Sequence, residues 1–138
     1  MACRKHYNVV AAVIEVDGKV LCMQRGITRY PYTSHRWEFP GGKIEPGETP
    51  QQALHREIIE EMDYDIQVHE LLATATHDYP DFTITLSAYR CTAATTAFTM
   101  REHIASRWLQ WNELNTLQWC AADERLIALF PEKIDFRR

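Results

Sequence analysis

The sequence predicts an α+β fold, in which helices pack against a mixed β-sheet. Two segments with helical character, near residues 49–63 and 121–129, alternate with several runs that are rich in β-branched residues. The chain of 138 residues is long enough to bury a core, and its 46% apolar and 25% charged residues are ordinary for a globular protein. No repeat, low-complexity tract or linker interrupts it, so we expect residues 1–138 to form one domain.

The predicted strands are short and rich in β-branched or aromatic residues. The first two flank Asp17-Gly18, a turn signal that favours a tight hairpin. The segment 26–36 is polar, aromatic and rich in turn formers, so it is expected to be a loop. The predicted strands are residues 8–15, 20–23, 37–39, 65–76, 83–92, 95–99 and 107–110. After them we expect a short helical turn at 112–117 and a helix at 121–129.

The first helix has a clear beginning and an apolar stripe. Thr49 is a suitable N-cap, Pro50 suits the first helical position, and Gln52 completes a capping box. Asp63 is expected at the end of the helix. The apolar residues that recur at i, i+4 spacing, and therefore share one face, are Leu54, Ile58 and Met62.

The charge balance argues against a protein that grips nucleic acid. The formal net charge is −4 and no basic stripe is present, whereas proteins that hold DNA or RNA through phosphates carry clustered Lys and Arg. A chain of this charge that handles a polyphosphate needs metal ions to neutralise it. We therefore expect a small-molecule partner and no nucleic acid.

The sequence also favours a cytoplasmic protein. No apolar run approaches the roughly 20 residues that span a bilayer, and the start, MACRKH, lacks the core of a signal peptide. The four cysteines are scattered without a CxxC pair, which argues against a disulfide framework or a zinc knuckle. We expect no membrane partner, reduced thiols, and either a monomer or a homodimer.

Three glutamates of the first helix form the strongest chemical signal. Glu57, Glu60 and Glu61 are related by i+3 and i+4, so their carboxylates project from one side of the helix. Like charges crowded in this way destabilise a helix unless something compensates, and Mg²⁺ or Mn²⁺ suits such hard oxygen ligands. The alternative is the solvated acidic face of an ordinary surface helix.

Flanking residues decide between these two interpretations. Arg56, one turn before Glu60, is placed to hold carboxylates, and Glu48 is a candidate partner for its guanidinium. Gly41-Gly42 lets the backbone approach a metal or phosphate closely. Six fixed positions match together, and at about one in twenty per position a chance match is on the order of 10⁻⁸ per window. The metal-site interpretation is therefore favoured.

Residues 41–64, GGKIEPGETPQQALHREIIEEMDY, resemble the signature box of the Nudix family. The segment WEFPGGKIEPGET, the Gln24-Arg25 pair and the late AADE resemble its MutT-like branch, which includes pyrophosphohydrolases of CTP and 8-oxo-dGTP. One position departs from the box, because Asp63 stands where glycine is expected. Asp tolerates a left-handed helix end better than most residues, so we expect a small effect on stability and no loss of chemistry.

The resemblance implies an α/β/α sandwich and a metal-dependent pyrophosphohydrolase of nucleoside triphosphates. Glu57, Glu60, Glu61 and the carbonyl of Gly41 would bind Mg²⁺, or Mn²⁺ in its place. Water would attack a metal-bound phosphate and release a nucleoside monophosphate and pyrophosphate. The general base would be Glu57 or a glutamate of a later loop, for which Glu102 is the best candidate.

Asp78 and Asp81 are weaker candidates for that base, because turns favour Asp for local reasons. Glu102 itself is open to a second interpretation as a solvated loop carboxylate.

The same resemblance suggests residues that contact the substrate. Arg25 resembles a phosphate-contacting position, although an Arg at a strand end is also a common partner in a surface salt bridge. Asp123 resembles a base-contacting position, where an ionised carboxylate would select a donating edge, as in cytosine or 8-oxoguanine; alternatively it caps the last helix. The aromatic loop 30–37 either stacks on a base or packs internally. The other predicted contacts are Glu38, Phe39, Pro40, Gly41 and Lys43.

Two further functions stay open. The same helix would serve a hydrolase of another nucleoside diphosphate derivative, such as ADP-ribose, a dinucleoside polyphosphate or a nucleotide sugar, although the sequence has no clear additional motif for them. A catalytically silent module that binds nucleotides is the third possibility. Such modules usually lose glutamates of the box, and all of them are present here.

Overall fold

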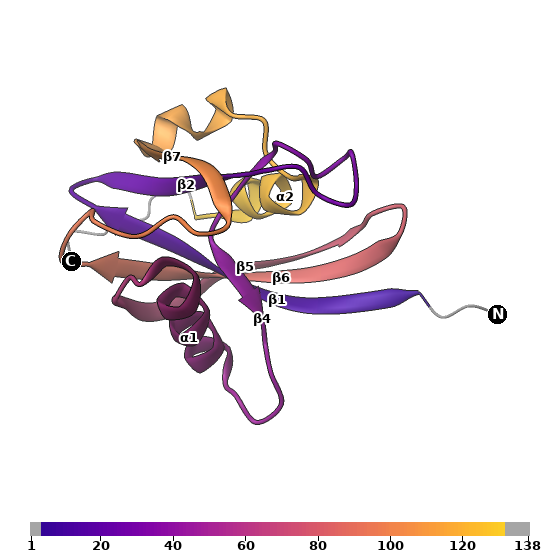
Figure 1. Ribbon diagram of the computed structural model, residues 1–138, viewed down its shortest axis with the longest axis horizontal. Coiled ribbons are helices and arrows are strands. Elements are labelled where there is room, and N and C mark those ends of the chain that lie inside the picture. The colour runs from indigo at the N-terminus through magenta and orange to yellow at the C-terminus, as the bar shows by residue number, and fades with distance from the viewer. Residues whose placement is uncertain (1–3, 132–138) are drawn as a thin grey trace.

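The computed structural model describes residues 4–131, which form a seven-stranded mixed sheet with an α-helix on each face (Figure 1). This is the α+β sandwich that the sequence predicts. In chain order the elements are β1 (Lys5–Val16), β2 (Lys19–Arg25), β3 (Trp37–Glu38), β4 (Gly41–Lys43), α1 (Pro50–Met62), β5 (Ile66–Asp78), β6 (Phe82–Ala93), β7 (His103–Leu109), the 3-10 helix η1 (Trp111–Thr116) and α2 (Ala121–Leu129).

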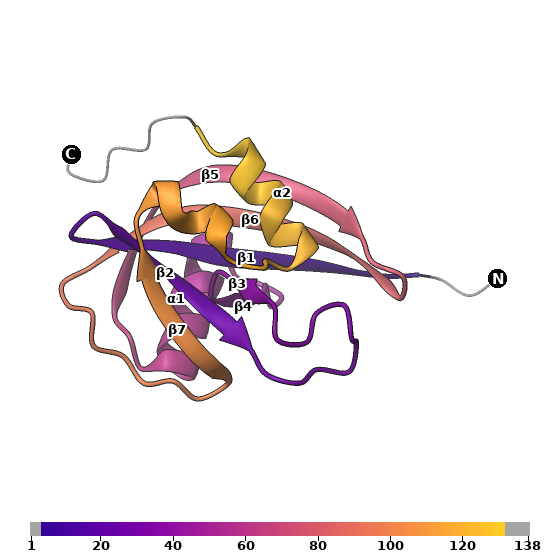
Figure 2. The same ribbon diagram turned by 90° about the horizontal axis from the view of Figure 1, so that it is seen from above.

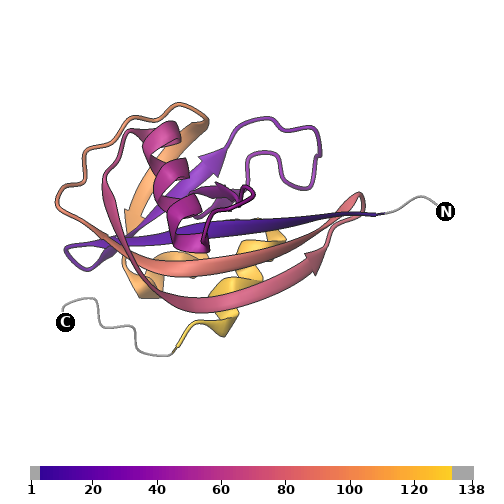
Figure 3. The ribbon, with the colours of Figure 1, turned by 90° about the horizontal axis from the view of Figure 1, so that it is seen from below.

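Strand β1 is the centre of the sheet, whose order is β3-β2-β1-β6-β5. It runs parallel to β6 along most of its length, as Figure 3 shows from below, and it turns into β2 through Asp17 and Gly18, both at positive φ. The predicted hairpin is therefore confirmed. Further along, β4 pairs with β1, and β7 pairs with β2 on the side seen in Figure 2.

Two separate apolar cores explain why the middle of β1, residues 9–14, is wholly apolar. Val10, Ala12 and Ile14 face α1, whereas Ala11 and Val13 face α2, and all five are at most 1% exposed. A strand covered on both faces carries no polar alternation. Helix α1 fills the first core with Ala53, Leu54, Ile58 and Met62, which confirms the predicted stripe.

Both ends of α1 follow the sequence signals. The hydroxyl of Thr49 accepts a hydrogen bond from the amide of Gln52 at 3.1 Å, and the side chain of Gln52 accepts one from the amide of Thr49 at 3.0 Å. At the other end Asp63 adopts the left-handed conformation with φ 47, and its amide donates to the carbonyl of Ile59. The Asp in place of glycine thus retains the expected helix end.

Three boundary predictions were wrong. Residues 95–99 form no strand, because the amide of Thr99 donates to the carbonyl of Met62 at 2.8 Å, so this segment covers the end of α1 instead of joining the sheet. Residues 41–43 pair with β1 as β4, although two glycines and a preceding proline had suggested a loop. Strand β7 begins at His103, four residues earlier than predicted, and pairs with β2.

Within the described residues, Cys22, Cys91 and Cys120 are buried free thiols. Burial raises the pKa of Cys22 to about 12, so this thiol stays protonated and unreactive. No helix in residues 4–131 is long and apolar enough to cross a membrane.

Candidate active site

A cavity of about 650 Å³ opens beside the central strands, between the carboxylates of α1 and the beginning of α2. The volume suits a small-molecule ligand. Residues from 25 to 123 converge on it, although they are far apart in the chain. The predicted site residues that line it are Arg25, Glu38, Phe39, Gly41, Lys43, Glu61, Glu102 and Asp123.

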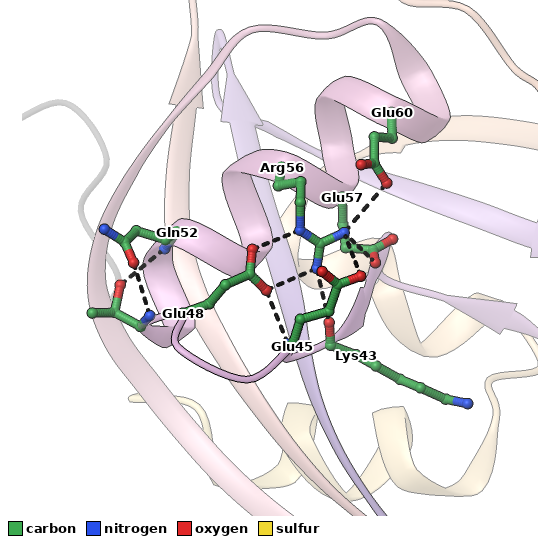
Figure 4. Close-up of polar contacts among 8 residues, drawn as sticks. Lys43, Glu45, Glu48, Gln52, Arg56, Glu57 and Glu60 are labelled. Atoms are coloured by element: carbon green, nitrogen blue, oxygen red, sulfur yellow. Dashed lines mark hydrogen bonds and ion pairs between the residues drawn. The ribbon is translucent and has the colours of Figure 1, made fainter.

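Arg56 binds the carboxylates of the box that do not line the cavity (Figure 4). Its guanidinium donates to both oxygens of Glu48 at 2.6 and 2.9 Å, to Glu57 at 3.0 Å and to Glu60 at 3.3 Å. It also donates to the carbonyl of Lys43 at 3.2 Å. These bonds hold the pKa of Glu48 below its ordinary value. Arg56 therefore joins the loop before α1 to two consecutive turns of the helix.

Glu45 adds a fourth carboxylate to this cluster, 3.7 Å from the guanidinium of Arg56. No spacing rule in the sequence singles it out. Glu60 is the most exposed member that the sequence predicted, with a side chain 61% exposed, and it does not line the cavity.

The two glycines of β4 make room for the chain itself. A Cβ on Gly41 would lie 1.9 Å from the carbonyl oxygen of Val10, and a Cβ on Gly42 would lie 2.3 Å from the carboxyl carbon of Glu57. Gly42 thus lets Glu57 lie directly against β4. The close neighbours of the two glycines are Val10 and Glu57, and the predicted approach of this backbone to a metal or phosphate stays a prediction.

Glu61 is the carboxylate of α1 that faces the cavity. Burial, together with the negative charges of Glu102 and Glu57, raises its pKa to about 8. Within residues 4–131 Glu61 forms no ion pair with a cationic side chain. Several oxygen donors held together without a counter-charge are what a hard divalent cation binds. The donor set therefore fits Mg²⁺ or Mn²⁺.

Glu38, which also lines the cavity, is held by two donors. Arg25 contacts one carboxylate oxygen at 3.1 Å, and Nε2 of His103 contacts the other at 2.8 Å. The side chain of His103 is only 7% exposed. No spacing in the sequence marks His103, because its partner lies 65 residues earlier and only the pairing of β2 with β7 brings them together.

Asp123 is buried next to Glu38. Its carboxylate accepts a hydrogen bond from the amide of Phe39 at 3.0 Å, and burial followed by the charge of Glu38 raises its pKa. The N-cap of α2 is Cys120, not Asp123, so the helix-cap alternative is wrong. One side-chain atom each of Glu38, Cys120 and Asp123 lies within 4.8 Å of the others. Two carboxyl groups thus share a small, largely buried pocket.

Aromatic rings form the remaining wall. Tyr30 lines the cavity and stacks on Tyr32, which stacks in turn on Tyr79 and donates its hydroxyl to Asp81 at 2.6 Å. Most of the aromatic loop therefore packs internally, which is one of the two interpretations of its sequence. Tyr79 and Phe82, which the sequence did not indicate, also line the cavity.

Three predicted site residues have structural contacts instead. Asp81 binds Tyr32, and Asp78 accepts a hydrogen bond from Thr83 at 2.6 Å, so neither rival to Glu102 lines the cavity. Pro40 is buried, and its carbonyl accepts from the amide of Ala12 at 2.7 Å. Pro40 does not line the cavity, and its contact with the substrate stays a prediction.

The family model of the NUDIX domain matches residues 4–135. The chain belongs to the Nudix family. Its box is the loop and helix that carry the Arg56 cluster, and its sheet supplies the cavity.

Nudix proteins of the MutT type are among the relatives. The 8-oxo-dGTP diphosphatase of Proteus vulgaris is 44% identical over 96 residues, which cover 67% of this chain and 81% of that protein. The CTP pyrophosphohydrolase of Escherichia coli (strain K12) is 36% identical over 127 residues, 88% of this chain and 81% of that protein. The solution structure of the MutT protein of methicillin-resistant Staphylococcus aureus 252, a Nudix hydrolase, matches with a TM-score of 0.70 and 40% identity over 91% of this chain and 95% of that one.

Proposed function

We propose that this Nudix protein is a divalent-metal-dependent pyrophosphohydrolase that cleaves a nucleoside triphosphate to the monophosphate and pyrophosphate. The observation that carries this proposal is the group of carboxylates at one end of a cavity, where Glu61 is crowded by Glu57 and Glu102 without a cationic partner. The names of two relatives, an 8-oxo-dGTP diphosphatase and a CTP pyrophosphohydrolase, support the same reaction.

Glu57, Glu60, Glu61 and the carbonyl of Gly41 would hold the metal, which we take to be Mg²⁺ with Mn²⁺ as a substitute. When bound, the metal supplies charge neutralisation of the triphosphate and a lower pKa for the attacking water. Arg56 keeps Glu57 and Glu60 in fixed positions through its hydrogen bonds. Glu48 fixes Arg56 in turn.

A carboxylate of the site accepts the proton of the attacking water. Glu57 is the first candidate, because Gly42 and Arg56 hold it in place. Glu102 is the second, because it lines the cavity next to Glu61. Arg25 and Lys43 line the same cavity and bring positive charge to the phosphates of the substrate.

The part of the cavity formed by Glu38 and Asp123 favours a base with hydrogen-bond donors. Glu38 and Asp123 both present carboxyl oxygens there, and in the ionised form such oxygens accept hydrogen bonds from amino or N–H groups. Cytosine offers its amino group, whereas 8-oxoguanine offers N1–H and its amino group. We therefore propose cytidine nucleotides or oxidised guanine nucleotides as substrates. Uracil and thymine fit this part of the cavity least well.

A substrate panel tests the reaction. Normal, 8-oxo and 5-methyl nucleoside triphosphates, ADP-ribose and a dinucleoside polyphosphate are incubated with Mg²⁺ or with EDTA, and pyrophosphate, phosphate and nucleotide products are quantified. We expect pyrophosphate and monophosphate from a triphosphate only when the metal is present. Binding of triphosphates without turnover would identify a silent module, and preferred cleavage of ADP-ribose would replace the proposed substrate class.

We further propose that residues 1–138 act as one domain in the cytoplasm, where nucleoside triphosphates are present. The family match over residues 4–135 supports the single domain. Size-exclusion chromatography with light scattering would distinguish a monomer from a homodimer.

A further inference from the structure

The segment before β7 is attached to the end of α1. The guanidinium of Arg101 donates to the backbone carbonyl of Glu60 at 2.6 Å, and the amide of Thr99 donates to the carbonyl of Met62 at 2.8 Å. The last carbonyls of a helix have no partner within the helix. Arg101 and Thr99 supply such partners, and Arg101 itself does not line the cavity.

The residue two positions later is attached to a different element. His103 contacts Glu38 of β3 through Nε2, and its backbone pairs with that of Arg25 at the end of β2. Glu102 therefore lies between two anchored neighbours, Arg101 bound to α1 and His103 bound to β3. Glu102 is itself an exposed residue that lines this cavity.

A β-bulge completes the arrangement. Gln24 pairs with Ala105 whereas Arg25 pairs with His103, so Ile104 is an extra residue in β7. Because side chains alternate across a strand, one extra residue changes the face to which the preceding residues point, and bulges are frequent beside active sites for this reason. The bulge sets His103 on the side of Glu38.

We propose that Arg101 and His103 are positioning residues that hold the carboxylate of Glu102 beside Glu61, one from each side of Glu102 along the chain. This inference rests on the proposed function in one respect, namely that Glu102 takes part in the hydrolysis of the nucleotide. An exposed glutamate samples many conformations unless its backbone is fixed, and the two anchors supply that constraint. The contact of His103 with Glu38 also ties this backbone segment to β3.

A double-mutant cycle on Arg101 and Glu102 tests the proposal, with kcat and KM measured at saturating Mg²⁺. Removal of a general base lowers kcat by at least about 100-fold. A general base that is no longer held in position lowers kcat by about tenfold. We expect these losses for Glu102→Gln and Arg101→Ala, with KM nearly unchanged. Arg101→Lys should recover much of the activity, because the ammonium group also donates to a carbonyl. In the Glu102→Gln background Arg101→Ala should cause no further loss.

The matched control is Arg107→Ala, which removes an exposed arginine of β7 whose guanidinium lies over the ring of Trp37. It should leave kcat unchanged. His103→Ala should lower kcat and raise KM together because it also releases Glu38, and His103→Gln, which retains a donor, should recover both. Additive losses in the cycle, or a loss in Arg107→Ala equal to that in Arg101→Ala, would overturn the proposal.

Binding of Mn²⁺, followed by electron paramagnetic resonance, gives a readout that needs no turnover. Removal or displacement of the carboxylate beside Glu61 weakens the attraction for a cation, so Glu102→Gln and Arg101→Ala should each weaken Mn²⁺ binding by about threefold to tenfold. The double variant should be no weaker than Glu102→Gln alone. If the wild-type protein hydrolyses no nucleotide, the proposed function fails, yet this binding cycle still decides whether Arg101 positions Glu102. Additive weakening contradicts the inference.

Discussion

Replacing Gly42 with alanine is the sharpest perturbation of the proposed site. The added Cβ would lie 2.3 Å from Cδ, 2.4 Å from Oε2 and 2.6 Å from Cγ of Glu57. All three atoms belong to the end of one flexible side chain, so the clash is relieved by rotation of Glu57. The fold is retained, and the carboxylate leaves its position.

The size of the effect follows from these distances. Ordinary contact begins at 3.4 Å, so the carboxyl carbon must retreat by about 1.1 Å. Misplacement of a catalytic group by about 1 Å costs on the order of 100-fold in rate, which corresponds to about 2.7 kcal/mol of transition-state stabilisation. We therefore expect Gly42→Ala to lower kcat/KM by about 100-fold while Tm changes by only a few degrees.

Pyrophosphate release and thermal unfolding, measured on the same preparations, provide the assay, and two other glycines are the controls. Gly41→Ala would place a Cβ 1.9 Å from the backbone oxygen of Val10, which no side-chain rotation relieves, so Tm should fall strongly. Gly47 is at φ +84 in open space, so Gly47→Ala should cost about 1 kcal/mol of stability and leave kcat/KM unchanged. If Gly42→Ala keeps kcat/KM within threefold of the wild type, Gly42 does not secure a position of Glu57 that matters for catalysis.

Three other predictions concern single carboxyl groups. Glu57→Gln should lower turnover by at least about 100-fold with an unchanged circular dichroism spectrum, and a variant that keeps most of its activity would remove Glu57 from the mechanism. The pKa of Glu61 is raised from 4.5 to about 8, so between these pH values the folded metal-free protein holds more protons than the unfolded chain, and the free energy of unfolding should fall as the pH rises. Denaturant unfolding in EDTA at pH 5 and pH 8 measures this slope, which Glu61→Gln should largely remove; an equal slope in that variant contradicts the assignment. Asp123→Asn, which adds an amide donor, should lower kcat/KM for the preferred base by about tenfold or more relative to uracil, as measured across the nucleotide panel. An unchanged preference would exclude Asp123 from base recognition.

Local signals were sufficient to predict α1 from the sequence. Its capping box, apolar stripe and end all depend on residues within a few positions of one another, so pattern and propensity agree with the final packing. The contact of Arg56 with Glu48 could be predicted as well, because the two residues are only 8 positions apart, in the loop and the beginning of the helix. The effect of having Asp63 in place of glycine could also be predicted, because the left-handed helix end is a property of the local backbone.

Features that depend on pairing between strands far apart in the sequence could not be predicted from local patterns. Residues 95–99 have strand-like composition, but their backbone groups bind the end of α1, and no local pattern reports such a choice. Gly41–Lys43 lacks strand propensity and is a strand only because β1 lies beside it. His103 joins the site for the same reason, through a pairing with β2 that includes a bulge.

The structure also separates three glutamates that spacing alone makes equivalent. Arg56 contacts Glu57 and Glu60, so part of their charge is already balanced within the protein. Glu61 faces the cavity with Glu102 nearby and has no such partner among residues 4–131. We therefore expect Glu61 and Glu102 to attract the proposed cation most strongly, with Glu57 and Glu60 as further ligands. The helix supplies carboxylates at the right spacing, but the strands around it determine which of them remain uncompensated and can attract the metal.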